Sequence, residues 1–218
     1  MKLKLIILVT ILYGSMIACT NESKENVSNN IIKNTDTVFQ FTYPNDEQSI
    51  EDSLSHYFGL STISSLKGDS LIRFFVYGDS AYLIIDLDKK NCQARVIRFL
   101  ADINNDIGLI KIKKIEDRFV NKSKVWWESL DSVLLHRNIY GLKGQYSTLS
   151  TGGYSVCIQQ HFLNTYYSSV IDNPEFYLYL NSNDFIDKDD IIKKNVALIM
   201  DFLFKELSIK SKMFESLR

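Results

Sequence analysis

The sequence predicts an α+β fold in which a mostly antiparallel meander sheet packs against two main helices, at about residues 123–137 and 187–208. Short apolar runs rich in β-branched and aromatic residues follow one another from residue 71 to residue 115, with short polar breaks between them. Two longer segments instead repeat apolar residues at helical spacing. Because strands come in groups rather than alternating singly with helices, a doubly wound parallel sheet is not expected.

The domain begins with an extended segment and a short helix. Residues 38–43 alternate aromatic with polar residues, as in a half-buried strand. After Pro44, apolar residues recur at helical spacing over residues 50–58, and Gly59 stands where a helix is expected to end. We therefore expect one strand and one short helix before the meander.

The meander contains at least four strands. Residues 71–77, 81–87 and 92–100 are β-rich runs joined by turn-type tripeptides, and residues 109–115 alternate aliphatic residues with lysine. The helix that follows carries its apolar residues within an arc of about 120°. They are Trp126, Trp127, Leu130, Val133 and Leu134. This arc favours packing of both tryptophans against the sheet over a ligand-stacking platform.

The last third of the domain contains a loop, two strands and the strongest helix. Residues 141–153 are glycine-rich and are expected to form a mobile loop, whereas residues 154–162 and 165–171 have strand character. Residues 177–180 could also be extended. Asp187 is expected to cap the terminal helix, whose first turn is acidic and whose apolar face is broad.

The N-terminus has the pattern of a secretory signal. Lys2 and Lys4 precede an apolar run, and the uncharged stretch over residues 5–18 is shorter than the roughly 20 residues of a transmembrane helix. Ala18-Cys19, with Met16 and Ile17 before it, resembles the lipobox of bacterial lipoproteins, although Leu and a small residue are more usual at positions 16 and 17.

The lipoprotein resemblance implies a membrane anchor at Cys19. It implies cleavage before Cys19, diacylglycerol on its thiol and an acyl chain such as palmitate on its amine. Several acyl chains hold a protein stably on a membrane, because each buried methylene contributes about 0.8 kcal/mol. Thr20 rather than Asp follows the cysteine, which by the usual sorting rule implies the outer membrane.

The expected organisation has three parts: a signal peptide at residues 1–18, a lipidated cysteine with a polar tether at 19–36, and a single domain at 37–218. Without the signal the chain keeps 23 of its 25 basic side chains against 26 acidic ones, so it lacks the electrostatic footprint of a nucleic-acid binder. The order of elements over residues 71–207 resembles uncharacterised envelope lipoproteins of Gram-negative bacteria. That resemblance implies no activity.

No catalytic or metal-binding motif stands out. The three histidines are isolated and no paired CxxC occurs, so no zinc site or other cofactor is expected. Cys157 and His161 lie four residues apart on a strand, about 13 Å, which is too far for a thiol–imidazole dyad. P-loop and serine-hydrolase motifs are missing. The aspartates around Asp187 favour helix capping over a calcium site.

Two sets of residues are candidates for other roles. Cys92 and Cys157 lie on expected strands, and an oxidising envelope allows either a disulfide between them or two buried thiols. Tyrosines on the later strands could form an aromatic binding surface, although sheet packing is the alternative. They are Tyr166, Tyr167, Tyr177 and Tyr179.

We therefore expect a lipid-anchored envelope protein, non-catalytic, that binds a protein or glycan partner and not nucleic acid. A hydrolase with dispersed carboxylates and an immunity-type inhibitor of a secreted toxin are the alternatives.

Overall fold

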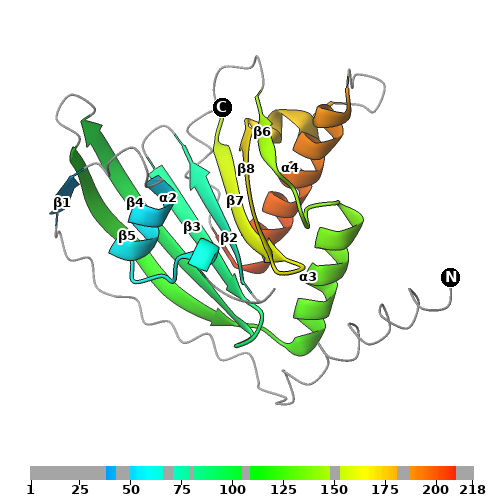
Figure 1. Cartoon of the computed structure of the whole chain (residues 1–218), viewed down its shortest axis with the longest axis horizontal. Coiled ribbons are helices and arrows are strands. Elements are labelled where there is room, and N and C mark those ends of the chain that lie inside the picture. Colours follow the sequence, from blue (N-terminus) through cyan, green and yellow to red (C-terminus); the bar gives the residue numbers. More distant parts are fainter. Residues whose placement is uncertain are drawn as a thin grey trace, which may run out of the picture.

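The computed structural model describes residues 38–42, 50–65, 71–78, 81–104, 109–147, 153–180 and 187–209 (Figure 1). The expected signal, the lipidated Cys19 and the tether lie outside these residues. One eight-stranded sheet contains all the described strands, in the order β1-β5-β4-β3-β2-β7-β8-β6. Every pairing is antiparallel except the one between β6 and β8. The predicted α+β class, with a mostly antiparallel sheet, is confirmed.

The strands are β1 (Val38–Thr42), β2 (Leu71–Tyr77), β3 (Ala81–Asp88), β4 (Gln93–Asn104), β5 (Leu109–Asn121), β6 (Gly144–Tyr146), β7 (Ser155–Phe162) and β8 (Thr165–Asp172). The α-helices are α2 (Ile50–Tyr57), α3 (Lys124–His136) and α4 (Lys188–Glu206), and two short 3-10 helices are η2 (Ile63–Ser65) and η3 (Pro174–Leu178). The meander strands and the two main helices were expected close to these positions.

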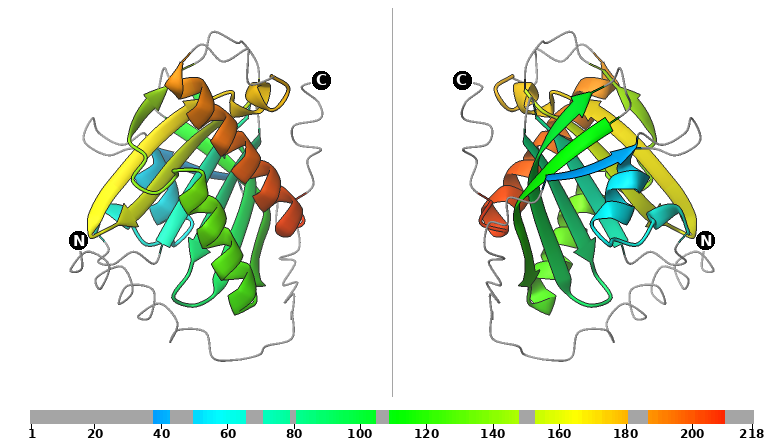
Figure 2. Two further views of the ribbon diagram at one scale, coloured as in Figure 1. Left: turned by 90° about the vertical axis from the view of Figure 1, so that its right-hand side faces the viewer. Right: turned by 90° about the vertical axis from the view of Figure 1, so that its left-hand side faces the viewer.

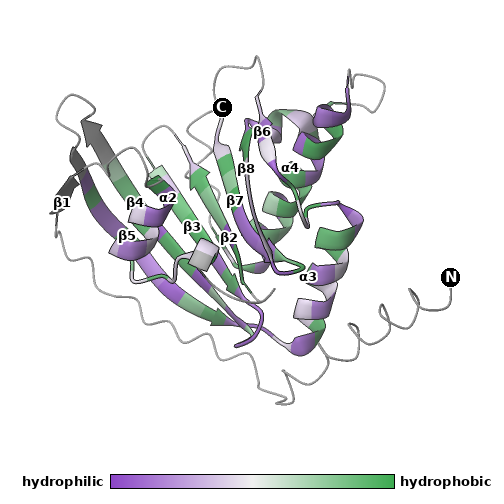
Figure 3. Ribbon diagram, in the orientation of Figure 1, coloured by the Kyte–Doolittle hydropathy of each residue, from purple (hydrophilic) through white to green (hydrophobic). Residues whose placement is uncertain are grey.

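Helices α3 and α4 lie across one face of the sheet, and α2 and η2 lie on the other face (Figure 2). The first face holds the larger core, to which Trp126 and Trp127 contribute at 9% and 4% exposure. The prediction that both tryptophans pack into the core is confirmed. Strand β2 is buried on both faces and is predominantly hydrophobic, whereas β5 carries polar residues along its length (Figure 3).

The α2 face has a smaller core. Leu54 and Phe58 pack on Phe75, Ile97 and Phe99, and the rings of Phe58 and Phe99 lie 4.9 Å apart. Because α2 has only eight residues, it covers a small part of this face and leaves polar side chains beside it.

Two local expectations were wrong, and one expected strand was too short. Tyr177 lies in η3 rather than in an extended segment, because Pro174 fixes the first turn of that helix. The expected loop over residues 141–153 contains β6, whose three residues pair with β8 and are too few to produce a periodic pattern. Strand β5 continues to Asn121 because it pairs with β4 along its length.

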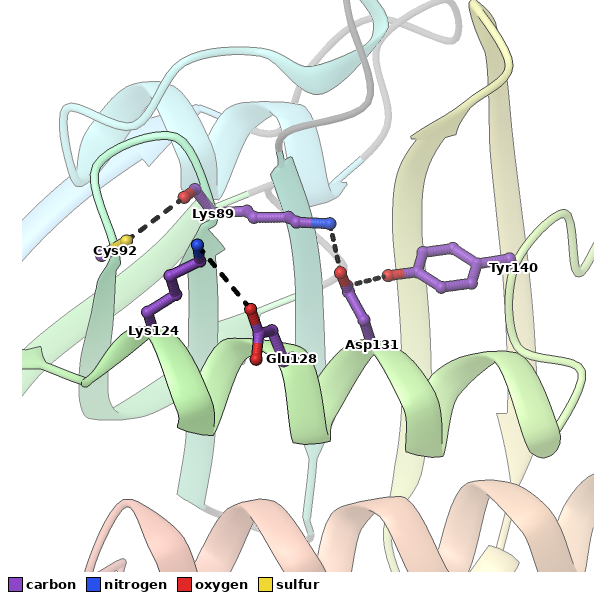
Figure 4. A network of polar contacts seen from close by, with 6 residues as sticks. All are labelled: Lys89, Cys92, Lys124, Glu128, Asp131 and Tyr140. Carbon is purple, nitrogen blue, oxygen red and sulfur yellow. Dashed lines mark hydrogen bonds and ion pairs between the residues drawn. The ribbon is translucent and has the colours of Figure 1, made fainter. Parts of the chain in front are cut away.

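A polar network fixes the β3–β4 turn to α3 (Figure 4). Lys89 at the turn forms an ion pair with Asp131 of α3, and the Tyr140 hydroxyl donates to the other carboxylate oxygen at 2.6 Å. Lys89 and Asp131 are each about one third exposed, so the pair contributes little stability. The Lys89–Asp131 ion pair and the Tyr140 hydrogen bond join groups of the same chain, so this network positions the β3–β4 turn.

Candidate ligand-binding site

A row of polar side chains crosses the α2 face of the sheet. Gln159, Arg73, Asp86, Arg95 and Phe119 are successive register partners on β7, β2, β3, β4 and β5. Directly opposed residues of neighbouring strands project on the same side, so these five side chains lie next to one another. The sheet therefore sets two arginines and a carboxylate in a line beside the smaller core.

Arg73 is the most unusual member of this row because its side chain is fully buried. Its Nε donates to Asp86 Oδ1 at 2.7 Å, and its Nη1 donates to the Ser55 hydroxyl of α2 at 2.7 Å. Its Nη2 is buried and has no hydrogen-bond partner in the described part of the chain. A buried donor left unsatisfied costs roughly 1–3 kcal/mol, so an acceptor at this atom, from a water molecule or a ligand, would be stabilising.

Asp86 of the row and Asp117, which pairs with Arg95, have opposite pKa shifts. Burial raises the pKa of Asp86 above its usual value, and the neighbouring Arg73 guanidinium only partly opposes that shift. Burial alone would also raise the pKa of Asp117, but hydrogen bonds and charge from Arg95, with help from Lys114, lower it below its usual value. Asp117 is therefore firmly ionised, and Asp86 takes up a proton more readily.

Arg95 contacts both the Asp117 carboxylate and the Phe119 ring. Its Nε and Nη2 donate to the two oxygens of Asp117, each at 2.9 Å, which is a bidentate pair. Its guanidinium carbon lies 5.1 Å from the centre of the Phe119 ring, a cation–π contact. Phe119 is nevertheless 43% exposed, so part of its ring is open to a ligand.

A pocket of about 180 Å3 opens beside this row. The connection between α2 and η2 forms one wall, and strands β2 to β5 form the other. Gly59 begins that connection with φ of 65°, a left-handed conformation that glycine adopts without strain. The side chains that supply polar or aromatic groups to the pocket are Ser61, Arg73, Asp86, Asp88, Gln93, Arg95 and Phe119.

Two carboxylates of the pocket lie on one face of β3, two residues apart. Asp88 accepts hydrogen bonds from the Asn91 backbone at 3.1 Å and from its side-chain amide at 2.6 Å, one at each carboxylate oxygen. Asp86 holds Arg73. Because both groups are engaged by the protein, the arrangement resembles a binding surface more than an acid–base pair.

The disulfide alternative between Cys92 and Cys157 is wrong. Cys157 is a free, buried thiol in the smaller core, whereas Cys92 packs against the larger core on the opposite face. Burial raises the pKa of the Cys157 thiol well above its usual range, and its Sγ lies 3.9 Å from the Ser168 hydroxyl. Neither ring nitrogen of the buried His161 has a hydrogen-bond partner in the structure's described residues, so Cys157 and His161 form no dyad there.

The four tyrosines do not form one surface. Tyr166 and Tyr167 are consecutive on β8, and successive side chains of a strand point to opposite faces. Tyr177 is buried at 6% exposure beside Lys193, and Tyr179 is 71% exposed. The predicted aromatic surface is therefore wrong, and its residues have separate structural environments.

The sequence reasoning missed Arg73, Asp86 and Arg95. Each is a charged residue in the middle of an apolar strand, which is a signal that could have identified them. Asp187, by contrast, caps α4 as predicted, and its carboxylate accepts from the backbone of Asp189 and Asp190.

Among the described residues no cluster of histidine, cysteine or carboxylate side chains could hold a metal ion. Within the same residues, no helix combines the length and the apolar character needed to cross a membrane. Comparison of the sequence with protein-family models and with curated proteins gives no match.

Proposed function

We propose that this chain is a lipid-anchored protein of the cell envelope whose domain is a non-catalytic binding module for a protein or glycan partner. One observation carries the binding proposal: the fully buried Arg73, whose Nη2 has no partner in the part of the chain that the structure describes, lines an open pocket. The anchor proposal depends on the signal-like N-terminus and on the lipobox-like Ala18-Cys19, and Thr20 after the cysteine favours the outer membrane.

The energetics of Arg73 favour a ligand. Burial of a guanidinium is expensive unless all its donors are used, and a well-packed apolar side chain would serve the core as well or better. Ligand sites use a few fixed polar groups to orient the bound molecule. Arg73 is held in place by Asp86 and Ser55, so its remaining donor is already oriented before a partner arrives.

A pocket-filling substitution tests the binding proposal. Ser61 is exposed and lines the pocket, whereas Ser64, three residues later, is also exposed and is not among the lining residues. We expect Ser61→Trp to abolish capture of an envelope component by the anchored protein in cross-linked membranes, and Ser64→Trp to leave capture unchanged. Equal capture by Ser61→Trp and the wild type would refute binding at this pocket.

Replacement of the lipidated cysteine tests the anchor. We expect Cys19→Ser to lose both membrane association and incorporation of labelled fatty acid. The anchor proposal fails if the variant still sediments with membranes while the wild type takes up no label.

A hydrolase is the second candidate, because Asp86 and Asp88 line the same pocket. Paired carboxylates are the usual acid–base equipment of glycoside hydrolysis. In that case the mature protein would turn over a glycan or ester substrate, and Asp86→Asn would abolish turnover without weakening substrate binding. Turnover that survives Asp86→Asn would exclude this pocket as the catalytic site.

A further inference from the structure

The groups of the pocket that have no partner among the described residues include both donors and acceptors. Arg73 lines the pocket, and its Nη2 is a buried donor with no hydrogen-bond partner among the described residues. Asp86 uses Oδ1 for Arg73, which leaves Oδ2 as an acceptor, and Gln93 donates its amide to Asn121 at 3.3 Å, which leaves its carbonyl oxygen. A ligand that satisfies these groups must both accept and donate hydrogen bonds within a few ångströms.

The charges of the pocket exclude simpler ligands. Each arginine is already paired with a carboxylate, Arg73 with Asp86 and Arg95 with Asp117, and Asp88 adds a further negative charge. Asp86 and Asp88 would therefore repel a free anion, and a cation would provide no hydrogen-bond acceptor for Arg73. An apolar molecule would satisfy none of the polar groups.

A sugar satisfies all of these conditions. Each of its hydroxyl groups both donates and accepts, and it carries no net charge. Its C–H face packs on aromatic rings, and Phe119 presents a partly exposed ring at the pocket. The pocket volume of about 180 Å3 is of the order of one six-membered sugar ring.

We propose that this pocket binds one neutral sugar residue of an envelope glycan, with Arg73 donating to a sugar oxygen, Asp86 and Gln93 accepting from hydroxyl groups, and Phe119 packing on the ring. This inference depends on the proposed binding function and specifies its ligand. The sugar supplies an acceptor for the Nη2 of Arg73, which the protein buries without a partner among the described residues.

Ligand-observed saturation-transfer NMR on the mature, full-length lipoprotein tests the proposal. The protein is held in a detergent without sugar head groups, and the probes are glucose, galactose, mannose and N-acetylglucosamine. We expect at least one of them to bind with a dissociation constant in the millimolar range. Acetate, phosphate and glycine serve as anion and zwitterion controls.

Matched variants assign the binding to this pocket. Removal of an aromatic contact of this kind weakens binding by about tenfold, so we expect that loss for Phe119→Ala. Gln93→Ala should weaken binding by several-fold. Phe176→Ala is the control, because Phe176 is 46% exposed but lies on η3, which packs against α4, and it should change affinity less than twofold.

The outcomes separate this inference from the proposed function. If no sugar binds but Ser61→Trp still abolishes envelope capture, the sugar assignment is wrong and the binding module stands. If no sugar binds and Ser61→Trp has no effect, both proposals fail. Acetate or phosphate binding as tight as the sugars, or equal losses in Phe119→Ala and Phe176→Ala, also overturns the sugar site.

Discussion

Single substitutions in the buried Arg73–Asp86 pair should lower the free energy of unfolding much more than the double substitution does. Asp86→Leu leaves a guanidinium at zero exposure with no carboxylate, and arginine cannot lose its proton to relieve this. Removal of one partner from a buried pair costs about 3–5 kcal/mol. Because 13% of the Asp86 side chain remains exposed, we expect about 3 kcal/mol for Asp86→Leu.

Arg73→Met should cost less than Asp86→Leu. The pKa of Asp86 is already raised by burial, so the carboxyl can take up a proton when Arg73 is removed. The double variant Arg73→Met/Asp86→Leu replaces both charges by apolar side chains. We expect it to recover most of the lost stability, to within about 1 kcal/mol of the wild type.

Urea unfolding measures these differences on the chain produced without its signal and carrying Cys19→Ser, with Trp126 and Trp127 as the fluorescence probes. Sugar binding is measured on the same samples, and the double variant should lose it. A double variant no more stable than the worse single variant would refute the argument, because the pair would then be needed for folding itself. So would a larger loss in Arg73→Met than in Asp86→Leu.

Three further predictions concern the rest of the domain. Trp127→Ala should lower the free energy of unfolding by about 3–5 kcal/mol, because Trp127 is 4% exposed. Val125→Ala, at 69% exposure, should change it by less than about 0.5 kcal/mol. Urea unfolding compares the two variants, and similar losses would contradict the assigned core. Cys157 should resist iodoacetamide at pH 8 in the folded protein and react only after unfolding, because it is buried with a raised pKa; labelling of its peptide under native conditions, followed by mass spectrometry, would contradict this. The pKa of Asp117 is lowered on folding, so its contribution to stability is present above about pH 4, the pKa of an unfolded aspartate, and is lost as pH falls through the lower folded value. Unfolding at a series of acid pH values should therefore show a smaller loss of stability in Asp117→Asn than in the wild type. An equal loss in the two proteins would contradict the shift.

Most of the secondary structure was predictable because hydrophobic periodicity and turn residues are local signals. The meander strands and the capped helix at Asp187 are examples. The 3-10 helix at Tyr177 was missed although Pro174 is a local signal for its first turn, because its five residues are too few for a helical period and the helix packs against α4. Strand β6 exists only through its pairing with β8.

The candidate site was much less predictable than the fold. Arg73 and Asp86 stand out as charges in apolar strands, but their pairing depends on the register of β2 and β3, which no local pattern specifies. The disulfide alternative and the tyrosine surface failed for a related reason. Cys92 and Cys157 lie on opposite faces, and so do Tyr166 and Tyr167.

Because Arg73 bonds to both the sheet and α2, ligand binding in the pocket should change the dynamics of α2. One guanidinium bonds the sheet through Asp86 and the helix through Ser55, and its third nitrogen has no partner among the described residues and is the one proposed to bind a sugar. A molecule that immobilises this guanidinium therefore also restrains the short helix, which contributes no residue to the pocket. Amide hydrogen exchange across α2 should slow when the pocket fills, so occupancy can be followed without a labelled ligand.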